Sequence, residues 1–285
     1  MLSRKEFLAV SGATLLRGQG RADTFFGDAV AYERFMGRWS RLLAPLLVDF
    51  ASVRDTGRVL DVGSGTGALA FALAKRKSHC QVLGIDPSQA YVNYATSKNV
   101  FGKRVSFDVG DAQQLGRGDS VFDACLSLLV LNFIPDSRKA LRELIRVTKP
   151  GGVISAAVWD YGSGMRMLRV FWDAAKAVDP SSAVSDESRM PLSREGELAN
   201  LWNQTGLANV EEKALDITMH FASFADYWNA FLLGQGPAGA YMKNASDKLR
   251  QALRSELKRR LSLNSDDAPF TISARAWAVR GSVRK

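Results

Sequence analysis

The sequence predicts an α/β fold with parallel strands, and three observations support that prediction. Short apolar runs at 59–62, 81–85 and 104–109 have the length and composition of buried strands. The first two lead into helical patterns, so that strands and helices alternate. Each run ends at or near an aspartate. Because open α/β sheets bind ligands at the carboxyl ends of their strands, we expect these acids to form one ligand rim.

The first run belongs to the segment Arg58–Ala68 (RVLDVGSGTGA), which predicts a strand, a tight glycine turn and a helix N-terminus. Such a turn lets a ligand approach the backbone, and the helix start offers free N–H groups. Gly63, Gly65 and Ala68 fit the dinucleotide fingerprint. However, Asp61 stands two residues before the first glycine, where a carboxylate would repel a pyrophosphate and suit an ammonium. An amino-acid-like cofactor therefore fits better.

The next two strands end in further carboxylates. Asp86 follows the glycines by about 20 residues, the position from which an acid accepts both ribose hydroxyls, although NAD enzymes share this feature. Pro87 and Ser88 come next and open a helical pattern. Asp111 ends the third strand, where it is placed to accept a hydrogen bond from an adenine amino group.

Five motifs spanning about residues 58–159 together resemble the class I S-adenosylmethionine-dependent methyltransferases in order and spacing. They are VLDVGSGTG, GIDPS, GDAQQL, FDACLSLLVLNFIPD and LRELIRVTKPGGVI. The segments YERFMGRWS, WDY and GQGPA resemble a bacterial subgroup that acts on small molecules. The resemblance implies a Rossmann-like, seven-stranded sheet, mostly parallel with an antiparallel final hairpin, helices on both faces, and S-adenosyl-L-methionine as cofactor.

The resemblance also carries site residues onto this chain. The methionine part of the cofactor would contact Asp61, Gly63, Ser64, Gly65 and Gly67. The ribose would contact Asp86 beside Pro87 and Ser88, the adenine Asp111 and Ala112, and the cofactor as a whole Leu128 and Leu129. An N-terminal helix commonly closes over the cofactor in this family. Residues 29–53 form an amphipathic helical pattern, which makes Tyr32, Arg38 and Trp39 candidates, with Arg38 pairing the methionine carboxylate.

The remaining regular elements follow from apolar runs and periodicity. In chain order they are a strand at 121–126, a helix at 138–147, a strand at 153–159, a helix at 193–206, and strands at 210–218 and 270–279. We expect Pro150-Gly151-Gly152 to turn the chain into the strand at 153–159, and Ser193 to cap the helix that follows.

Two segments exceed this core, at about 160–193 and 221–264, and both are rich in aromatic residues. By analogy with related folds, we expect them to form helical cap insertions that roof the acceptor pocket. An aromatic roof predicts a small, apolar or aromatic methyl acceptor. The acceptor-pocket candidates are Asn132, Trp159, Tyr161, Trp172, Trp228 and Gln235. No catalytic base is assigned.

Composition suits a single domain, expected at 28–285, preceded by a flexible tail at 1–27 whose start resembles a twin-arginine signal. No apolar run reaches the length of a membrane span. Two cysteines and two histidines without a CxxC pattern argue against a metal site. The expectation is a cytoplasmic monomer or homodimer with a small-molecule partner.

Three alternatives remain. A formal charge of +9, concentrated in a helix at 248–260, would suit an RNA methyltransferase, although a solvated helix face also explains it. An NAD(P)-dependent oxidoreductase fits the glycines but not Asp61 and Asp111. A non-catalytic S-adenosylmethionine-binding protein would have the cofactor site without an open acceptor pocket.

Overall fold

The computed structural model describes residues 28–263 and 265–284; the tail expected at 1–27 lies outside them. Within these residues, seven strands form one sheet in the order β3-β2-β1-β4-β5-β7-β6. Their bounds are β1 Gly57–Val62, β2 Cys80–Asp86, β3 Val105–Val109, β4 Phe122–Leu128, β5 Thr148–Trp159, β6 Ala208–Phe221 and β7 Phe270–Ser282. The first five strands in this order are parallel, whereas β7 runs antiparallel to both β5 and β6. The expected sheet with an antiparallel final hairpin is confirmed.

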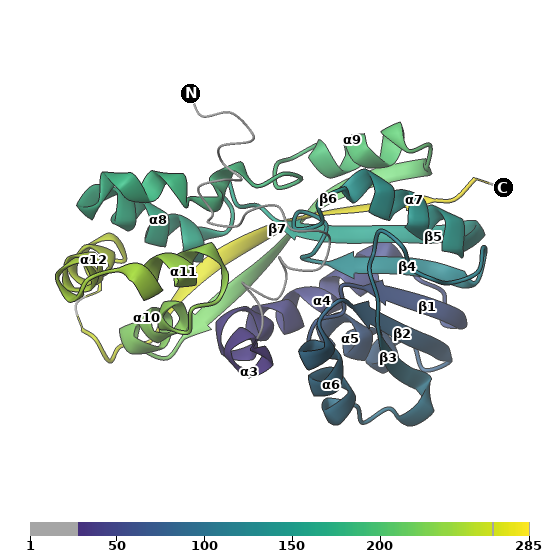
Figure 1. Cartoon of the computed structure of the whole chain (residues 1–285), viewed down its shortest axis with the longest axis horizontal. Coiled ribbons are helices and arrows are strands. Elements are labelled where there is room, and N and C mark those ends of the chain that lie inside the picture. The colour runs from purple at the N-terminus through teal and green to yellow at the C-terminus, as the bar shows by residue number, and fades with distance from the viewer. Residues whose placement is uncertain (1–27, 264, 285) are drawn as a thin grey trace.

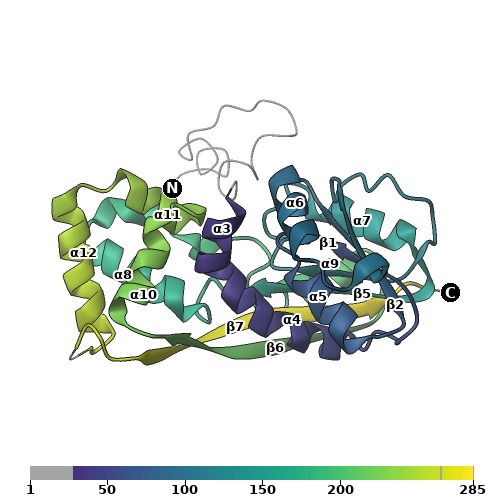
Figure 2. The ribbon, with the colours of Figure 1, turned by 90° about the horizontal axis from the view of Figure 1, so that it is seen from below.

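Helices cover both faces of the sheet, with α4, α5 and α6 on one face and α7 and α9 on the other (Figures 1 and 2). Their bounds are α4 Arg38–Ala51, α5 Ala68–Arg76, α6 Gln89–Lys98, α7 Ser137–Val147 and α9 Glu197–Gln204, and a 3-10 turn, η2 Gly102–Arg104, precedes β3. Periodicity explains this packing. In α7, for example, Leu141 and Leu144 lie one turn apart and are fully buried.

The N-terminal helix expected over 29–53 is present, with a feature that periodicity did not predict. α3 (Ala29–Tyr32) and α4 are joined without a break by a π-helical turn, η1 (Glu33–Gly37). Such turns are rare and often occur at functional sites. This one lies beside the glycine turn that follows β1.

A second group of helices surrounds the far ends of β6 and β7, which extend beyond the other strands (Figure 2). We call residues 160–193 and 221–263 the cap lobe. Its helices are α8 Arg166–Val178, η3 Pro180–Val184, η4 Glu187–Arg189, α10 Phe224–Leu232, α11 Gly236–Asn244 and α12 Asp247–Arg260. Aromatic rings form its core: Phe231 stacks on Phe171 at 4.3 Å between ring centroids and meets Tyr227 at 5.1 Å.

Two sequence-based expectations need correction. Pro150-Gly151-Gly152 is part of β5 rather than a turn, because Gly151 N–H bonds the Val283 carbonyl at 2.9 Å and extends the pairing with the end of the chain. Ser193 does not cap α9; its hydroxyl donates to the Met190 carbonyl, and α9 begins after Gly196. The Glu212 carboxylate instead accepts from the backbone N–H groups at this helix start.

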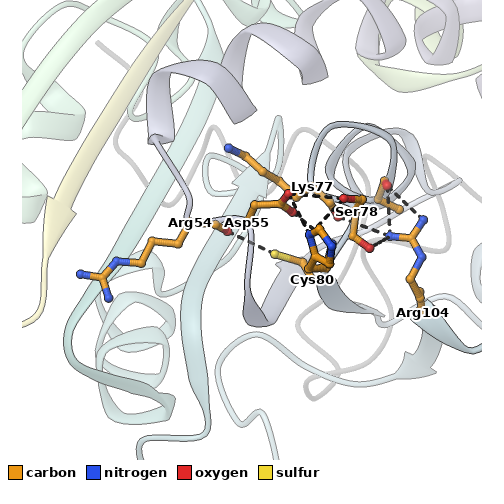
Figure 3. A network of polar contacts seen from close by, with 8 residues as sticks. Arg54, Asp55, Lys77, Ser78, Cys80 and Arg104 are labelled. Atoms are coloured by element: carbon orange, nitrogen blue, oxygen red, sulfur yellow. Dashed lines mark hydrogen bonds and ion pairs between the residues drawn. The ribbon is translucent and has the colours of Figure 1, made fainter.

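A polar network lies near the amino ends of β1, β2 and β3, at the opposite end of these strands from the glycine turn (Figure 3). Arg104 donates to the carbonyls of Ala74, Lys77 and Ser78 at the C-terminal end of α5, and Asp55 accepts from the backbone N–H of His79 at 3.1 Å.

Of the helices in the described ranges, none has the length and apolar character that crossing a bilayer requires. The same residues contain no cluster of three or more His, Cys, Asp or Glu side chains arranged around a metal position.

Candidate functional site

The glycine turn between β1 and α5 is fixed to the neighbouring strand by its backbone. The N–H groups of Gly63 and Ser64 both bond the carbonyl of Ile85, at 2.7 and 3.0 Å. Gly65 has φ +51, and a Cβ added there would meet nothing within 4 Å, because this residue faces a cavity. Gly67 differs: it faces Phe71, which a Cβ would contact at 2.6 Å. Gly63, Ser64 and Gly65 thus line the cavity, whereas Gly67 serves packing.

Asp61 is buried at the end of β1 and lines the same cavity. Neither of its carboxylate oxygens has a hydrogen-bond partner among the described residues. Burial raises the pKa of Asp61 to about 8; the backbone amide of Ala70 opposes this rise and the charge of Asp86 adds to it. A buried, unsatisfied carboxyl is costly unless a ligand completes it. An ammonium group is the ligand that fits, and the hydroxyl of Ser64, also without a partner here, lies on the same turn.

Asp86 lines the cavity and also shapes it. One of its oxygens accepts from Gly65 N–H at 2.8 Å, and the other from Ser88 N–H at 2.9 Å. The hydroxyl of Ser88 in turn caps α6 by accepting from Tyr91 N–H. Asp86 therefore connects the glycine turn to the start of α6, and both Pro87 and Ser88 reach the cavity wall.

The N-terminal helix closes one side of the cavity. Tyr32 lines the cavity, with its ring 5.6 Å from Tyr91 and its hydroxyl 3.2 Å from that of Ser40. Within the π turn, Glu33 accepts a hydrogen bond from the hydroxyl of Thr66 at 2.5 Å and forms an ion pair with Arg41. The helix is thereby attached directly to the glycine turn.

Two other candidates on this helix point elsewhere. Arg38 donates to Asp226 of α10 at 2.8 and 3.0 Å, and its guanidinium lies 4.2 Å from the ring of Trp39. Trp39 is buried against Phe221, 5.1 Å between ring centroids. Neither lines the cavity, so both connect the N-terminal helix to the cap lobe and β6 instead.

The adenine candidates also lie outside the cavity wall. Asp111 is exposed, and its carboxylate accepts from the backbone N–H of Gln113 at 2.8 Å. Ala112 is half-buried and does not line the cavity either. Leu128 and Leu129, by contrast, do line it. Leu129 has φ +64, a strained conformation for a non-glycine residue that the sequence did not reveal, and its N–H bonds the carbonyl of Ala157 at 2.7 Å.

Of the six acceptor-pocket candidates, the structure brings together three. Asn132, Trp159 and Tyr161 line the cavity. Both polar atoms of the Asn132 amide and Nε1 of Trp159 are buried without a hydrogen-bond partner in the described part of the chain. Unpaired polar groups in an apolar chamber are sites at which a ligand can be oriented.

The other three candidates do not line the cavity. Trp172 is fully buried and donates from Nε1 to Glu187 at 2.8 Å. Trp228 stacks on Phe224, 6.3 Å between ring centroids, and Gln235 precedes the first turn of α11. Glu187 itself lines the cavity, and sequence reasoning missed it. It sits in a polar stretch without a motif, and only its long-range contact with Trp172 shows that it is buried.

The cavity as a whole has a volume of about 1080 Å³ and extends from the glycine turn to α11 of the cap lobe. Apolar and aromatic side chains form most of its wall. A single ligand site typically occupies about 300–1,000 Å³, so this cavity has room for two small molecules in contact.

Comparisons with known proteins agree with this geometry. A family model described as a methyltransferase domain matches residues 60–156. An uncharacterized methyltransferase of Mycobacterium sp. (strain JLS) is 31% identical over 176 residues, 59% of this chain and 68% of the relative. The 2-methyl-6-phytyl-1,4-hydroquinone methyltransferase of Synechocystis is 35% identical over 115 residues, 40% of this chain and 36% of that enzyme.

Other known proteins match this chain over different shares of their length. Against uncharacterized mycobacterial proteins that are 30% identical, the match spans about half (53%) of their length. Among solved structures, the YcgJ protein of Bacillus subtilis superposes with a TM-score of 0.55 at 21% identity, covering 87% of this chain and 99% of that one. At this identity the structural match shows a shared fold.

Proposed function

Because the chain belongs to the class I S-adenosylmethionine-dependent methyltransferases, we propose that it transfers the methyl group of S-adenosylmethionine to a small acceptor with an apolar or aromatic body. One observation carries the proposal. A single cavity joins the unpaired carboxyl of Asp61 and the open backbone at Gly65 to the aromatic wall of the cap lobe. Cofactor and acceptor can therefore meet without crossing solvent.

The residues at the glycine turn fit the cofactor's polar end. Asp61 has unsatisfied oxygens to bind the ammonium group, and the positive charge of that group favours the ionised form of the carboxyl. Ligand binding there removes the cost of leaving a buried carboxyl unpaired. Asp86, at the carboxyl end of β2, lies where an acid receives ribose hydroxyls. Tyr32 and Leu129 form apolar walls around the same space.

When bound, S-adenosylmethionine supplies both the electrophilic methyl carbon and the leaving sulfur, so the protein needs no covalent nucleophile. The chain's own contribution is to orient the acceptor and exclude water. Alignment of this kind can contribute on the order of 7–11 kcal/mol to a two-substrate reaction. Asn132 and Tyr161 line the cavity and are polar groups available for orientation.

Two observations support a small acceptor over RNA. The basic side chains of α12 are largely paired, since Arg254 and Lys258 bind Asp266 while Arg259 and Arg260 bind Glu256. In addition, the Synechocystis relative is named for a hydroquinone acceptor. Both observations favour a small acceptor that binds inside the cavity over an RNA that binds the surface of α12.

Calorimetric titration with S-adenosylhomocysteine and S-adenosylmethionine tests the cofactor assignment. We expect the native protein to bind both, and Asp61→Asn to weaken binding by about 1.5–3 kcal/mol, the worth of a hydrogen bond to a charged group. Asp49→Asn, which removes a carboxylate from the exposed end of α4, is the matched control and should leave affinity unchanged. Failure of the folded native protein to bind either compound would contradict the proposal, and tight binding of NADH would favour an oxidoreductase.

A further inference from the structure

The cap lobe contributes one buried carboxyl to the cavity, that of Glu187 at the start of η4. Its side chain lines the cavity, and the residue is 7% exposed. The oxygen Oε2 accepts a hydrogen bond from Nε1 of Trp172 at 2.8 Å, which fixes the orientation of the carboxyl group. The other oxygen, Oε1, makes no hydrogen bond to any described residue. One acceptor atom is therefore held in place with its bonding capacity unused.

The cations nearest to Glu187 are committed to another carboxylate. Arg169 donates from both terminal nitrogens to Asp186, at 2.8 and 2.7 Å, and also to the carbonyl of Tyr161. Lys176 donates to the second oxygen of Asp186 at 3.1 Å. Asp186 is thus paired through both oxygens, whereas Glu187 next to it forms no ion pair with any residue that the structure describes.

The electrostatic consequence is a shift in the pKa values of two neighbouring groups. Burial raises the pKa of Glu187 to about 7, although the hydrogen bond from Trp172 and the charge of Arg169 oppose this rise. Burial and the charge of Glu187 together raise the pKa of Tyr161 well above its ordinary value, so the Tyr161 hydroxyl remains a donor. At neutral pH the chamber therefore holds a carboxyl group close to ionisation, beside a protonated phenol.

Such a chamber favours a cation. Ionising a buried carboxyl costs free energy that a ligand of opposite charge offsets, and the rings of Trp159, Tyr161 and Tyr241 in the cavity wall also attract cations through their faces. An anionic ligand would face repulsion from Glu187. Arg189 is the only cationic side chain among the described residues of the wall, and it is exposed rather than buried.

We propose that Oε1 of Glu187 binds the amino group of the methyl acceptor, and that the acceptor is a small amine with an aromatic or apolar body. This inference rests on the proposed function, because it assigns the cap end of the cavity to the acceptor. Asn132 and Tyr161, which line the same cavity, supply further polar groups for the acceptor.

The test uses matched ligands that differ only in the polar group. Tryptamine, tryptophol and indole-3-propionate form one set, and phenethylamine, phenethyl alcohol and hydrocinnamate a second. Affinity is measured by calorimetry with the full chain, both alone and saturated with S-adenosylhomocysteine. We expect the amine in at least one set to bind at least 10-fold more tightly than its alcohol and its acid.

The variant Glu187→Gln keeps an oxygen for Trp172 and removes the charge. It should reduce the preference for the amine to below 3-fold, leave the affinity of the alcohol unchanged and retain binding of S-adenosylhomocysteine. Glu195→Gln, an exposed carboxylate of the same segment of chain, is the matched control and should keep the full preference. The preference should also increase between pH 6 and pH 8 in the native protein and not in Glu187→Gln. The other titratable or charged groups around this site are Asp186, Arg169 and Tyr161, together with Asp179, Arg189 and Tyr241 of the cavity wall.

The outcomes separate the two proposals. An amine preference that is absent from the native protein in both sets, or that survives in Glu187→Gln, overturns the role of Glu187. If the native protein does not bind S-adenosylhomocysteine, the proposed function is overturned instead. The affinities measured without that compound then still show whether the cavity prefers the amine to the alcohol and the acid.

Discussion

The two ends of the cavity are built in different ways. At the glycine turn, backbone atoms and short side chains at the ends of neighbouring strands form the site. Asp61, Asp86 and Gly65 all lie at the carboxyl ends of β1 and β2 and line the same cavity. At the cap lobe, side chains that are distant in sequence form the site, such as Trp159 from β5, Glu187 from η4 and Tyr241 from α11. The first end of the cavity is encoded locally in the sequence and the second by long-range packing. We therefore expect mutations at the two ends to affect stability and ligand binding differently.

The largest effect is expected from Phe231→Ala in the cap lobe. Phe231 is fully buried and contacts the rings of Phe171, Tyr227 and Phe35. Removing it should lower the free energy of unfolding by about 3–5 kcal/mol, as large-to-small aromatic substitutions in cores do. Urea denaturation measures this loss. Affinity for S-adenosylhomocysteine, measured under conditions where the variant is folded, should change less than 3-fold; a larger loss would show that the two ends are not independent.

A smaller loss of stability with a larger loss of binding is expected from Gly63→Ala. Gly63 has φ +73, and a Cβ there would approach both γ-carbons of Val130 to 2.5 Å. Strain of this kind costs about 1–3 kcal/mol. Because the N–H of Gly63 bonds Ile85, the shift would also displace the glycine turn. Gly65→Ala provides the comparison: its added methyl meets open cavity, so its effect on binding should exceed its effect on unfolding.

The pH dependence of stability gives the third and smallest effect. The folded-state pKa of Asp61 is raised to about 8 by burial, so the folded protein holds a proton that the unfolded chain releases above its ordinary pKa. Stability must then fall as pH rises from about 4 towards 8. Asp61→Asn removes this contribution. The unfolding free energy of the variant relative to the native protein should increase by about 2 kcal/mol between pH 6 and pH 8, since each pH unit below the folded-state pKa is worth about 1.4 kcal/mol.

Parallel urea titrations at several pH values measure that difference. The raised pKa of Glu187 contributes equally to both proteins and cancels. A difference between the two proteins that is constant across this pH range would mean that Asp61 is ionised in the folded state without a ligand.

The same contrast explains what the sequence could predict. The sheet and its final hairpin follow from local signals, and so does the proposed cofactor side of the cavity, because a strand, a turn and a terminal carboxylate occupy adjacent positions. Arg38 and Trp39 share the periodicity of Tyr32 but face the cap lobe, since their partners Asp226 and Phe221 are about 190 residues away. Helical spacing alone does not distinguish a cavity wall from an interior contact.

The roles of polar residues in the cap lobe could not be predicted from the sequence for a related reason. Asp186 and Glu187 are adjacent and chemically similar, yet Asp186 is neutralised by Arg169 and Lys176 while Glu187 faces the cavity. Only the packing of η4 against α8 separates their roles. Asp111 shows the converse: its position in a motif predicts a ligand contact, and in the structure its carboxylate is exposed and accepts from the backbone N–H of Gln113 in a local turn.

The π turn at Glu33–Gly37 divides the N-terminal helix into two rotational registers. An α-helix advances about 100° per residue, so one residue more or less rotates everything on one side of the change by that angle. Tyr32, on one side of the turn, faces the cavity, while Leu43 and Leu47, on the other, are buried in the core. Shortening the π turn by one residue would rotate Tyr32 away from the cavity without altering the packing of α4. The helix can therefore change its ligand-facing surface and its core-facing surface separately.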